Sequence, residues 1–344
     1  GEFRMATPVM HAGRATAANP VLRGNYPDPG ALHVGDSQVV VASTGMRGGG
    51  AFPLHLSDDA GLTWRDAGVA IPKVPAWWGP PVESGRGERD FWAPEIHAAN
   101  GTFLLYYAAR HASGSLCIGV GRSMSGGPLG PYNDPLGKPL VRGELGQIDP
   151  TYYRDPATGR SYLIWKVDGN AAGRPTPIML QQLSADGLSL VGTNSTLLEG
   201  ANATWEGALV EAPWLVRDGS YYYLFYSANA YYDARYAVGV ARARAIDGPF
   251  ERRAHPALRT DSDAANPFAG PGHCSILRAA DGSAYALYHA WLRDGHGKVI
   301  GKFGRQMLRD EVRFDTADGW PSIGRGVPGY VNGTRAAARV RHAL

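Results

Sequence analysis

GTFLLYYAAR at residues 101–110 and GSYYYLFYSAN at 219–229 both begin with a turn and continue as a short alternating run rich in aromatic residues. The same pattern recurs at DSQVVVAST (36–44), GRSYLIWKV (159–167) and GSAYALYHAW (282–291), at intervals near 60 residues. Short runs of aromatic and β-branched residues after turn residues are typical of β-strands. The chain therefore contains five copies of one β unit.

Each copy has further strands on both sides. A segment such as FWAPEIHA (91–98) or QIDPTYYR (147–154) comes before it, and a second apolar run follows it. These following runs are PLHLS (53–57), LCIGVGRS (116–123), IMLQQLS (178–184), YAVGVARA (236–243) and VIGKFGRQM (299–307). Five repeats of three strands with a looser fourth predict an all-β fold, a five-bladed β-propeller with four-stranded antiparallel blades around a central channel.

The repeats also set the domain bounds. We expect residues 20–328 to form the propeller and 329–344 to be a C-terminal tail. Residues 1–19 are expected to be a cloning remnant, Gly1 to Arg4 ahead of Met5, followed by an N-terminal extension.

Composition excludes several partners. The net charge of +3 over 344 residues is too small to predict nucleic-acid binding, and no apolar run is long enough to span a membrane. The two cysteines, Cys117 and Cys274, fall in blades that are not neighbours, so buried free thiols are expected. Four N-x-S/T sequons favour a secreted, extracellular protein; they begin at Asn100, Asn194, Asn202 and Asn332.

Acidic residues recur where the innermost strands begin. Because these strands all run the same way along the channel, their starts gather on one face. The residues expected there at equivalent points are Asp28, Trp92, Asp149, Glu211 and His273. Three acids in register, each followed within two residues by proline, are not what a packed core would select. A functional funnel on the propeller axis is predicted.

Three motifs around these acids resemble a known enzyme family. YPDPG (26–30), IDPT (148–151) and VEAP (210–213) are similar, in order and spacing, to the signatures of glycoside hydrolase family 43. FWAPE (91–95), GPGH (270–273) and GRQ (304–306) add to the resemblance, which covers residues 20–328. The family contains arabinanases, α-L-arabinofuranosidases and β-xylosidases, and its fold is a five-bladed propeller.

The resemblance implies roles for the three acids. Asp28 would be the general base, Glu211 the general acid, and Asp149 a third carboxylate that orients Glu211 and keeps it protonated by like-charge repulsion. An inverting glycosidase holds its base and acid about 6.5–9.5 Å apart to leave room for a water molecule. The residues alone predict three carboxylates in one funnel, without assigning a role to each.

Other residues are candidates for binding. Phe91 and Trp92 are expected to form an apolar wall against the sugar, with core packing an equal alternative for Phe91. Asn229 and His289 end the second strands of blades four and five and would reach substrate hydroxyls, or else be satisfied within the fold. By resemblance, Arg305 contacts the sugar, and His273 faces a channel cation, usually calcium, mostly through water. Hydrogen bonding without metal is the alternative for His273. No organic cofactor is expected.

Substrate class is the least determined property. The loop at 70–90, with Trp77 and Trp78, is expected to close one end of the cleft. That closure favours an inverting, exo-acting 1,5-α-L-arabinofuranosidase. A β-xylosidase is the second alternative, an endo-1,5-arabinanase the third, and a non-catalytic carbohydrate-binding propeller the alternative of another class. The expected partner is plant cell-wall arabinan or its oligosaccharides, bound by a monomer. The Asp-box-like SDDAGLTW (57–64) is read as a structural turn.

Overall fold

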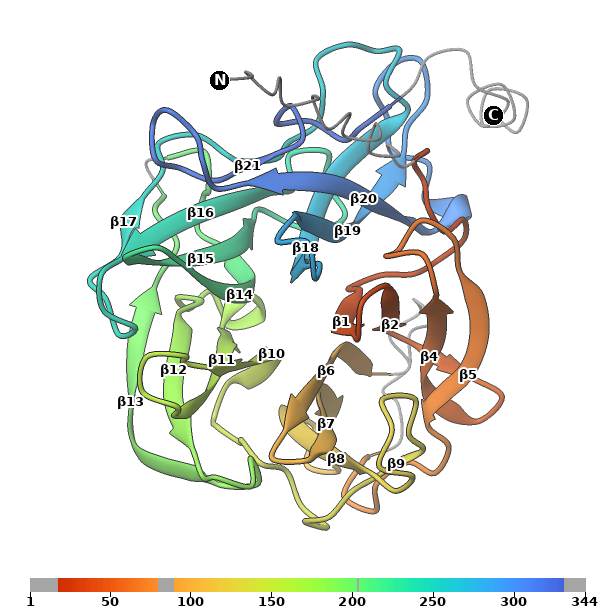
Figure 1. The fold of residues 1–344 in the computed structure, drawn as a ribbon, viewed down its shortest axis with the longest axis vertical. Helices are drawn as coiled ribbons and strands as arrows, with labels where there is room; N and C mark the ends of the chain where they lie inside the picture. The colour runs from red at the N-terminus through yellow and green to blue at the C-terminus, as the bar shows by residue number, and fades with distance from the viewer. Residues whose placement is uncertain (1–17, 80–89, 203, 331–344) are drawn as a thin grey trace, which may run out of the picture.

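The strands form five sheets arranged in a ring. A computed structural model describes residues 18–79, 90–202 and 204–330. Viewed down its shortest axis, the molecule places one strand of each sheet next to a central channel (Figure 1). The chain is thus a five-bladed β-propeller, as the repeats predict. No helix in these described ranges is long and apolar enough to cross a membrane.

Each blade is an antiparallel sheet built from consecutive strands. The first contains β1 (Gly30–Val34), β2 (Gln38–Ala42), β3 (Met46–Arg47), β4 (Gly50–Ser57) and β5 (Arg65–Ile71), and the second β6 (Phe91–Ala99), β7 (Thr102–Arg110), β8 (Leu116–Ser123) and β9 (Tyr132–Asn133). The third contains β10 (Gly146–Arg154), β11 (Ser161–Asp168), β12 (Ile178–Leu183) and β13 (Leu190–Leu198). The fourth contains β14 (Val210–Asp218), β15 (Tyr221–Ala228), β16 (Ala237–Ala243) and β17 (Glu251–Arg252), and the fifth β18 (Phe268–Arg278), β19 (Ala284–Leu292), β20 (Arg305–Arg313) and β21 (Ser322–Ile323).

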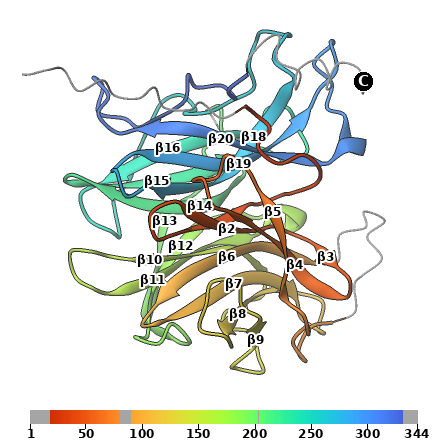
Figure 2. The same cartoon turned by 45° about the vertical axis from the view of Figure 1, so that its right-hand side comes forward.

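The inner strands close the ring by lying side by side. Strand β1 contacts β6, β6 contacts β10, and the sequence continues through β14 and β18 back to β1. Figure 2 shows β6 and β10 in this relation from an oblique direction. At one such contact a side chain has no room: a Cβ atom on Gly30 would lie 1.7 Å from the carbonyl oxygen of Pro94. The inner strands therefore pack backbone to backbone around the channel.

The core lies between the blades, on both faces of each sheet. In β7 six consecutive residues are buried, and β15 has seven. Because neighbouring blades cover both faces, these strands are continuous buried runs, which corrects the alternation expected for them from the sequence. This double burial explains why the second strands gave the clearest repeat in the sequence.

The two ends of the described chain meet on the fifth blade. Leu22 pairs with Met307 of β20, and the Asn19 side chain donates hydrogen bonds to the carbonyl oxygens of Arg309 and Gly329. Asn19 and Gly329 lie just outside the two ends of the propeller predicted from the repeats, residues 20 and 328. Both contact blade five directly.

Three local expectations can be compared with the strands. The third strand of blade five was expected at 299–307 but is Arg305–Arg313, because a short 3-10 helix, Gly301–Phe303, occupies the glycine-containing stretch before it. Asp59 of the Asp-box-like turn accepts hydrogen bonds from the Leu62 and Thr63 amides between β4 and β5, which confirms a structural turn. Both cysteines are buried and free, as expected.

Candidate active site

Bulges in the inner strands aim side chains into the channel. The pairing of β6, β10, β14 and β18 with their neighbours shifts register at Ala93, Asp149, Ala212 and His273. Each of these residues has a positive φ between 47° and 53°, and Asp28, just before β1, has 53°. Proline follows in four of the five blades, where its missing N–H suits a position outside the ladder.

The bulges correct the predicted alignment of the blades by one residue. Asp149 and His273 occupy the bulge itself, and Asp28 has the same positive φ just before β1, whereas blades two and four place alanine at this position. Trp92 and Glu211 each stand one residue before the bulge, equivalent to one another. Aspartate and histidine tolerate positive φ better than most side chains, and glutamate reaches the channel from the neighbouring position.

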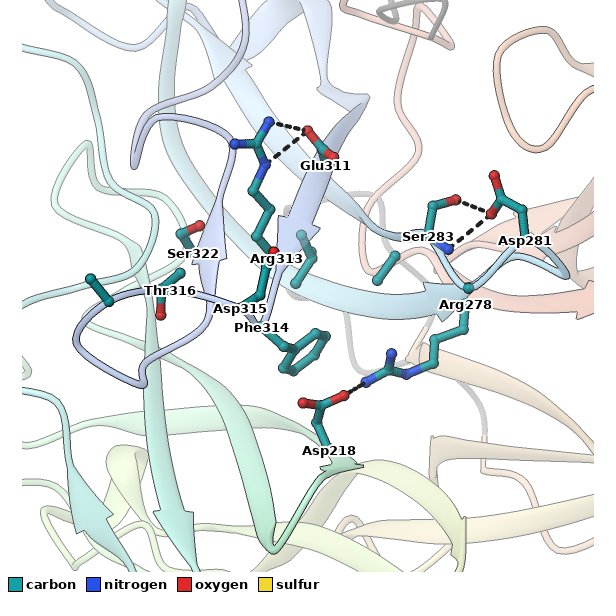
Figure 3. A pocket seen from close by; sticks show the side chains of 14 residues that line it. Asp218, Arg278, Asp281, Ser283, Glu311, Arg313, Phe314, Asp315, Thr316 and Ser322 are labelled. Carbon is teal, nitrogen blue, oxygen red and sulfur yellow. Dashed lines mark hydrogen bonds and ion pairs between the residues drawn. The ribbon is translucent and has the colours of Figure 1, made fainter. Parts of the chain in front are cut away.

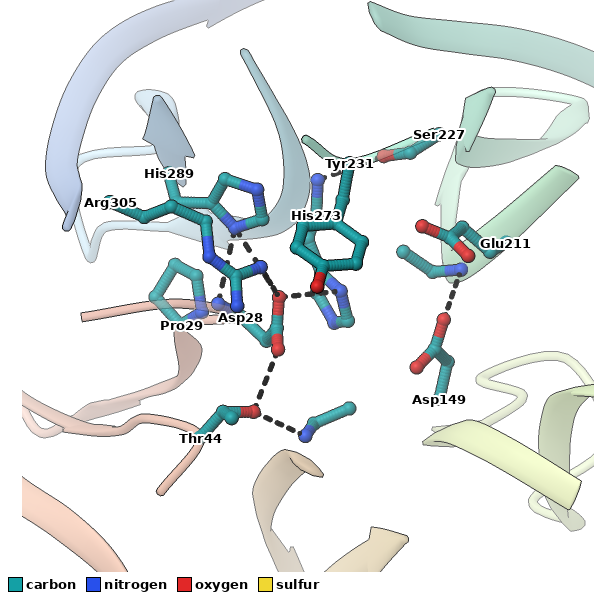
Figure 4. A network of polar contacts seen from close by, with 12 residues as sticks. Asp28, Pro29, Thr44, Asp149, Glu211, Ser227, Tyr231, His273, His289 and Arg305 are labelled. Carbon is teal, nitrogen blue, oxygen red and sulfur yellow. Dashed lines mark hydrogen bonds and ion pairs between the residues drawn. The ribbon is translucent and has the colours of Figure 1, made fainter. Parts of the chain in front are cut away.

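Asp28 is surrounded by cationic and imidazole groups (Figure 4). Its Oδ1 lies 3.0 Å from Nη1 of Arg305 and 3.3 Å from Nδ1 of His273, and its Oδ2 accepts a 2.7 Å hydrogen bond from the Thr44 hydroxyl. Burial alone would raise the pKa of Asp28, but Arg305, His273 and His289 outweigh burial and hold it well below the usual range. Asp28 is an ionised carboxylate at neutral pH.

His289 supports Asp28 from behind. Its Nδ1 accepts a 3.2 Å hydrogen bond from the Asp28 amide, and its ring lies parallel to that of Tyr236 at 5.7 Å. The side chain is fully buried, and burial followed by the Arg305 charge lowers the pKa of His289 to about 4. The neutral ring therefore fixes the backbone of Asp28 and lies beneath the carboxylate, out of reach of the pocket.

The pKa of Asp149 is shifted in the opposite direction to that of Asp28. Its Oδ2 accepts a 3.0 Å hydrogen bond from the Ala212 amide of the next blade. Burial raises the pKa of Asp149 to about 7, with the Glu211 charge adding to the rise and His273 and Lys166 opposing it. The funnel thus holds a carboxylate that is ionised, Asp28, beside a carboxyl that binds its proton near neutral pH.

Glu211 is fixed through both of its oxygens. Oε1 accepts a 2.8 Å hydrogen bond from the Tyr236 hydroxyl, and Oε2 lies 2.9 Å from Nζ of Lys166. Lys166 also lies 3.1 Å from Oδ1 of Asp168 and is completely buried. Burial would lower the pKa of Lys166, but Glu211, Asp168 and Asp149 outweigh burial and raise it, so the ammonium group stays charged.

A pocket of about 650 Å³ joins these groups on the propeller axis. All five blades contribute to it. Its lining residues include Asp28, Asp90, Trp92, Arg110, Asp149, Lys166, Asp168, Glu211, Tyr231, Tyr232, His273 and Arg305. The three acids that the sequence predicted to meet in one funnel do lie in one pocket. Asp28 is ionised, Asp149 is bonded to the Ala212 amide, and Glu211 is bonded to Tyr236 and Lys166.

Of the predicted binding residues, Trp92 and Arg305 line the pocket. Arg305 also lies over the ring of Tyr231, 4.7 Å from its centroid. Phe91 is fully buried against Phe52 and Trp78, which matches the core-packing alternative. Asn229 donates hydrogen bonds to the carbonyl oxygens of Trp205 and Arg235, and so anchors a loop beside the pocket rather than lining it.

His273 lines the pocket with Nδ1 directed at Asp28. Within the described residues no group of three or more histidine, cysteine or acidic side chains is arranged to hold a metal ion. Calcium prefers six to eight oxygen ligands, which these side chains do not supply around His273. The set does not fit an ion bound directly by protein side chains, and an ion held through water stays a prediction.

The loop expected to close the cleft is described only in part, because residues 80–89 lie outside the described ranges. In the described part, Trp77 stacks on Tyr107 at 6.3 Å and donates a hydrogen bond to Asp134. Trp78 packs on Phe91 at 5.3 Å. Both tryptophans therefore belong to the packing of blade two.

A second hollow, of about 900 Å³, lies between blades four and five around Phe314 (Figure 3). Arg278 there is paired with Asp218 at 2.6 Å, and Arg313 with Glu311 at 2.9 Å. None of the three acids of the funnel lines it. The chemistry is concentrated in the pocket on the axis.

Sequence reasoning missed two groups that contact Glu211. Lys166 sits within GRSYLIWKV, where it was read only as part of a strand, and Tyr236 begins the following strand motif YAVGVARA. A lysine inside an otherwise apolar run was a usable signal, since lysine is rarely buried without a partner. Tyr236 carried no such signal, because tyrosine is common throughout these strands.

Comparison with known proteins identifies the family. The profile of glycosyl hydrolases family 43 matches residues 17–321. A xylosidase/arabinosidase of Butyrivibrio fibrisolvens is 27% identical over 90% of this chain and 57% of its own length, and a non-reducing end α-L-arabinofuranosidase of Bacteroides ovatus is 27% identical over 90% and 54%. A β-D-galactofuranosidase of Aspergillus niger is 29% identical over 79% of this chain and 76% of its own length.

A solved structure agrees with these relatives. A thermostable family-43 glycoside hydrolase superposes with a TM-score of 0.77 and 27% identity, covering 93% of this chain and 99% of that one. The chain spans a little over half the length of the Butyrivibrio and Bacteroides relatives. The match over residues 17–321 shows that this chain belongs to glycosyl hydrolases family 43.

Proposed function

We propose that this glycoside hydrolase is an inverting exo-α-L-arabinofuranosidase that releases L-arabinose from the non-reducing end of α-1,5-linked arabinan or arabino-oligosaccharides. The observation that carries the proposal is that one pocket holds the ionised Asp28 together with Asp149, whose pKa is about 7, and Glu211, whose two oxygens are held by Tyr236 and Lys166. Inverting hydrolysis needs one carboxylate to activate water and one carboxylic acid to protonate the leaving oxygen.

In this reaction Asp28 acts as the general base. Arg305 and His273 keep it ionised, so it is ready to accept a proton from the attacking water. Thr44 and the His289–amide contact fix its orientation from below. The base is thus held rigid before the substrate arrives.

Glu211 acts as the general acid. Tyr236 and Lys166 hold its two oxygens at 2.8 and 2.9 Å, and Lys166 stabilises the carboxylate that remains after the proton has moved to the leaving oxygen. Asp149 accepts a hydrogen bond from the amide of Ala212, the residue after Glu211, and so positions the acid.

Exo action is part of the proposal. The pocket lies on the axis and takes lining residues from every blade. The names of the Butyrivibrio and Bacteroides relatives support arabinose as the released sugar. The proposed partner is therefore plant cell-wall arabinan, and the protein is proposed to be secreted and to act as a monomer.

Product analysis on linear 1,5-α-arabinan tests the proposal. Arabinose alone from the earliest time points is the expected result. A ladder of oligosaccharides would indicate endo action instead of exo action. A β-xylosidase, which the xylosidase/arabinosidase relative favours as second candidate, would release xylose from xylobiose and leave arabinan intact. Binding of arabinan without turnover by the unaltered protein would identify a non-catalytic carbohydrate-binding propeller.

A further inference from the structure

An aromatic ring stands exposed at the mouth of the pocket. Tyr232 is 59% exposed, although it lines the same pocket as Asp28 and Glu211, which are each 9% exposed. Among the described residues, the other exposed large apolar side chains are Met124 and Val191, and neither lines the pocket. The pocket therefore runs from buried acids at its inner end to an accessible aromatic face at its outer end.

We propose that Tyr232 is the platform on which the sugar of the leaving group stacks, one ring further out than the sugar whose bond is cleaved. The proposal rests on the proposed function, because it places the cleaved bond at Asp28 and Glu211. Its ligand is an uncharged furanose or pyranose ring. Such a ring offers an apolar C–H face to an aromatic side chain, while its hydroxyls stay in water.

A charged pair in the pocket wall agrees with an uncharged ligand. Asp90 and Arg110 line the pocket and neutralise one another, with Arg110 Nε 2.8 Å and Nη2 3.2 Å from the two carboxylate oxygens. Because the two charges are paired, neither is left in excess to attract an acidic or basic partner.

The loop that carries Tyr232 is fixed before any ligand binds. The Trp291 indole donates a 2.7 Å hydrogen bond to the carbonyl oxygen of Tyr231. Asn229 bonds the carbonyl oxygens of Trp205 and Arg235, at 3.0 and 3.2 Å, and so closes the loop at its two ends. Because the loop is already ordered, stacking on Tyr232 requires little conformational entropy.

The same loop is tied to the reacting centre. Tyr231 and Tyr232 meet edge to face at 5.4 Å, and Arg305 lies between Tyr231 and Asp28, 4.7 Å from the ring and 3.0 Å from the carboxylate. A sugar stacked on Tyr232 is therefore held at a defined place relative to the base. Its binding energy contributes to the transition state when the leaving group is a sugar.

Two substrates distinguish stacking of the leaving-group sugar on Tyr232 from the hydrolysis step itself. In 1,5-α-L-arabinobiose the leaving group is a sugar ring, whereas α-L-arabinofuranosyl fluoride has no ring there. The specificity ratio is defined as kcat/KM for the disaccharide divided by kcat/KM for the fluoride. We expect Tyr232→Ala to lower this ratio about three- to tenfold, the range of a single aromatic contact. Tyr232→Phe keeps the ring and should stay within about twofold of the unaltered protein.

Met124→Ala is the matched control, because it removes an exposed apolar side chain away from the pocket. Its ratio should equal that of the unaltered protein. Calorimetric binding of arabinobiose to Glu211→Gln, with and without Tyr232→Ala, gives a readout that needs no turnover, and Tyr232→Ala should weaken this binding by the same factor.

A specificity ratio and an affinity that are both unchanged in Tyr232→Ala would overturn the platform while leaving the proposed function intact. Failure of the unaltered protein to hydrolyse either substrate would overturn the proposed function and this inference together. That failure is recognised in the unaltered protein, before any variant is compared.

Discussion

Replacing Lys166 by methionine removes the buried ammonium group beside Glu211. At 2.9 Å and an effective dielectric constant near 20, the attraction between the two charges is about 6 kcal/mol, and burial of the lysine offsets part of it. An opposite charge at this range typically shifts a carboxyl titration by about 1–3 pH units. Lys166 also lowers the pKa of Asp149, which is about 7 in its presence.

Without Lys166, Asp149 loses a charge that lowers its pKa and therefore binds its proton more tightly. The basic limb of the kcat/KM profile, where the acid loses its proton, should therefore move about 1–3 pH units toward alkaline pH. At neutral pH kcat should fall, because the carboxylate left after proton donation has lost its counter-ion. Lys166→Arg keeps the charge and should leave the limb within about half a unit.

The assay is the pH dependence of arabinobiose hydrolysis between pH 4 and 10, with circular dichroism to establish that each variant is folded. Removing one partner of a buried pair costs about 3–5 kcal/mol of unfolding free energy, so measurements belong at low temperature. A folded Lys166→Met protein whose basic limb stays in place would refute the argument that Lys166 controls the acid.

Three further predictions concern the carboxyls themselves. Glu211→Ala should lower kcat/KM on arabinobiose by at least about a thousandfold and on arabinofuranosyl fluoride much less, since fluoride leaves without a proton; equal losses on both would contradict its role as the acid. Arg305→Met should raise the pKa of Asp28, because burial is no longer outweighed, and move the acid limb of kcat/KM to higher pH; an unmoved limb would show that Arg305 does not keep the base ionised. The pKa of Asp149 is about 7 in the folded protein and about 3.9 in the unfolded chain. The folded state therefore binds the proton more tightly, and this raises the free energy of unfolding fully below pH 4. The contribution is lost as the pH rises through 7. Asp149→Asn should therefore be more stable than the unaltered protein at pH 8, by up to about 4 kcal/mol in urea unfolding, with no difference near pH 4, and a variant of lower stability at pH 8 would contradict the raised pKa.

The fold was predictable because the sequence repeat falls in strands that are buried on both faces. Runs such as 101–110 and 219–229 have no polar alternation, since neighbouring blades cover them, and this made five equal copies visible. The error at 299–307 arose where glycines delay the strand to Arg305. Glycine does not by itself reveal whether a turn precedes or interrupts a strand.

The three acids were found because each is followed by proline within two residues at repeated positions, a pattern that accompanies the bulges. Their partners were harder to find. Lys166 comes from the second strand of blade three, and Tyr236 stands just before the third strand of blade four. Only the closed ring brings both to Glu211. Trp77 was expected in a loop that closes the cleft, and in the described part of that loop its ring stacks inward on Tyr107.

The stereochemistry of the first product tests the central claim most directly. Proton NMR of arabinobiose during the first minutes of hydrolysis distinguishes the two anomers before they equilibrate. If Asp28 activates water on the face opposite the leaving group, β-L-arabinose must appear first and the α anomer only later. Initial formation of α-L-arabinose would mean retention through a covalent intermediate, and would contradict the assignment of Asp28 as a base.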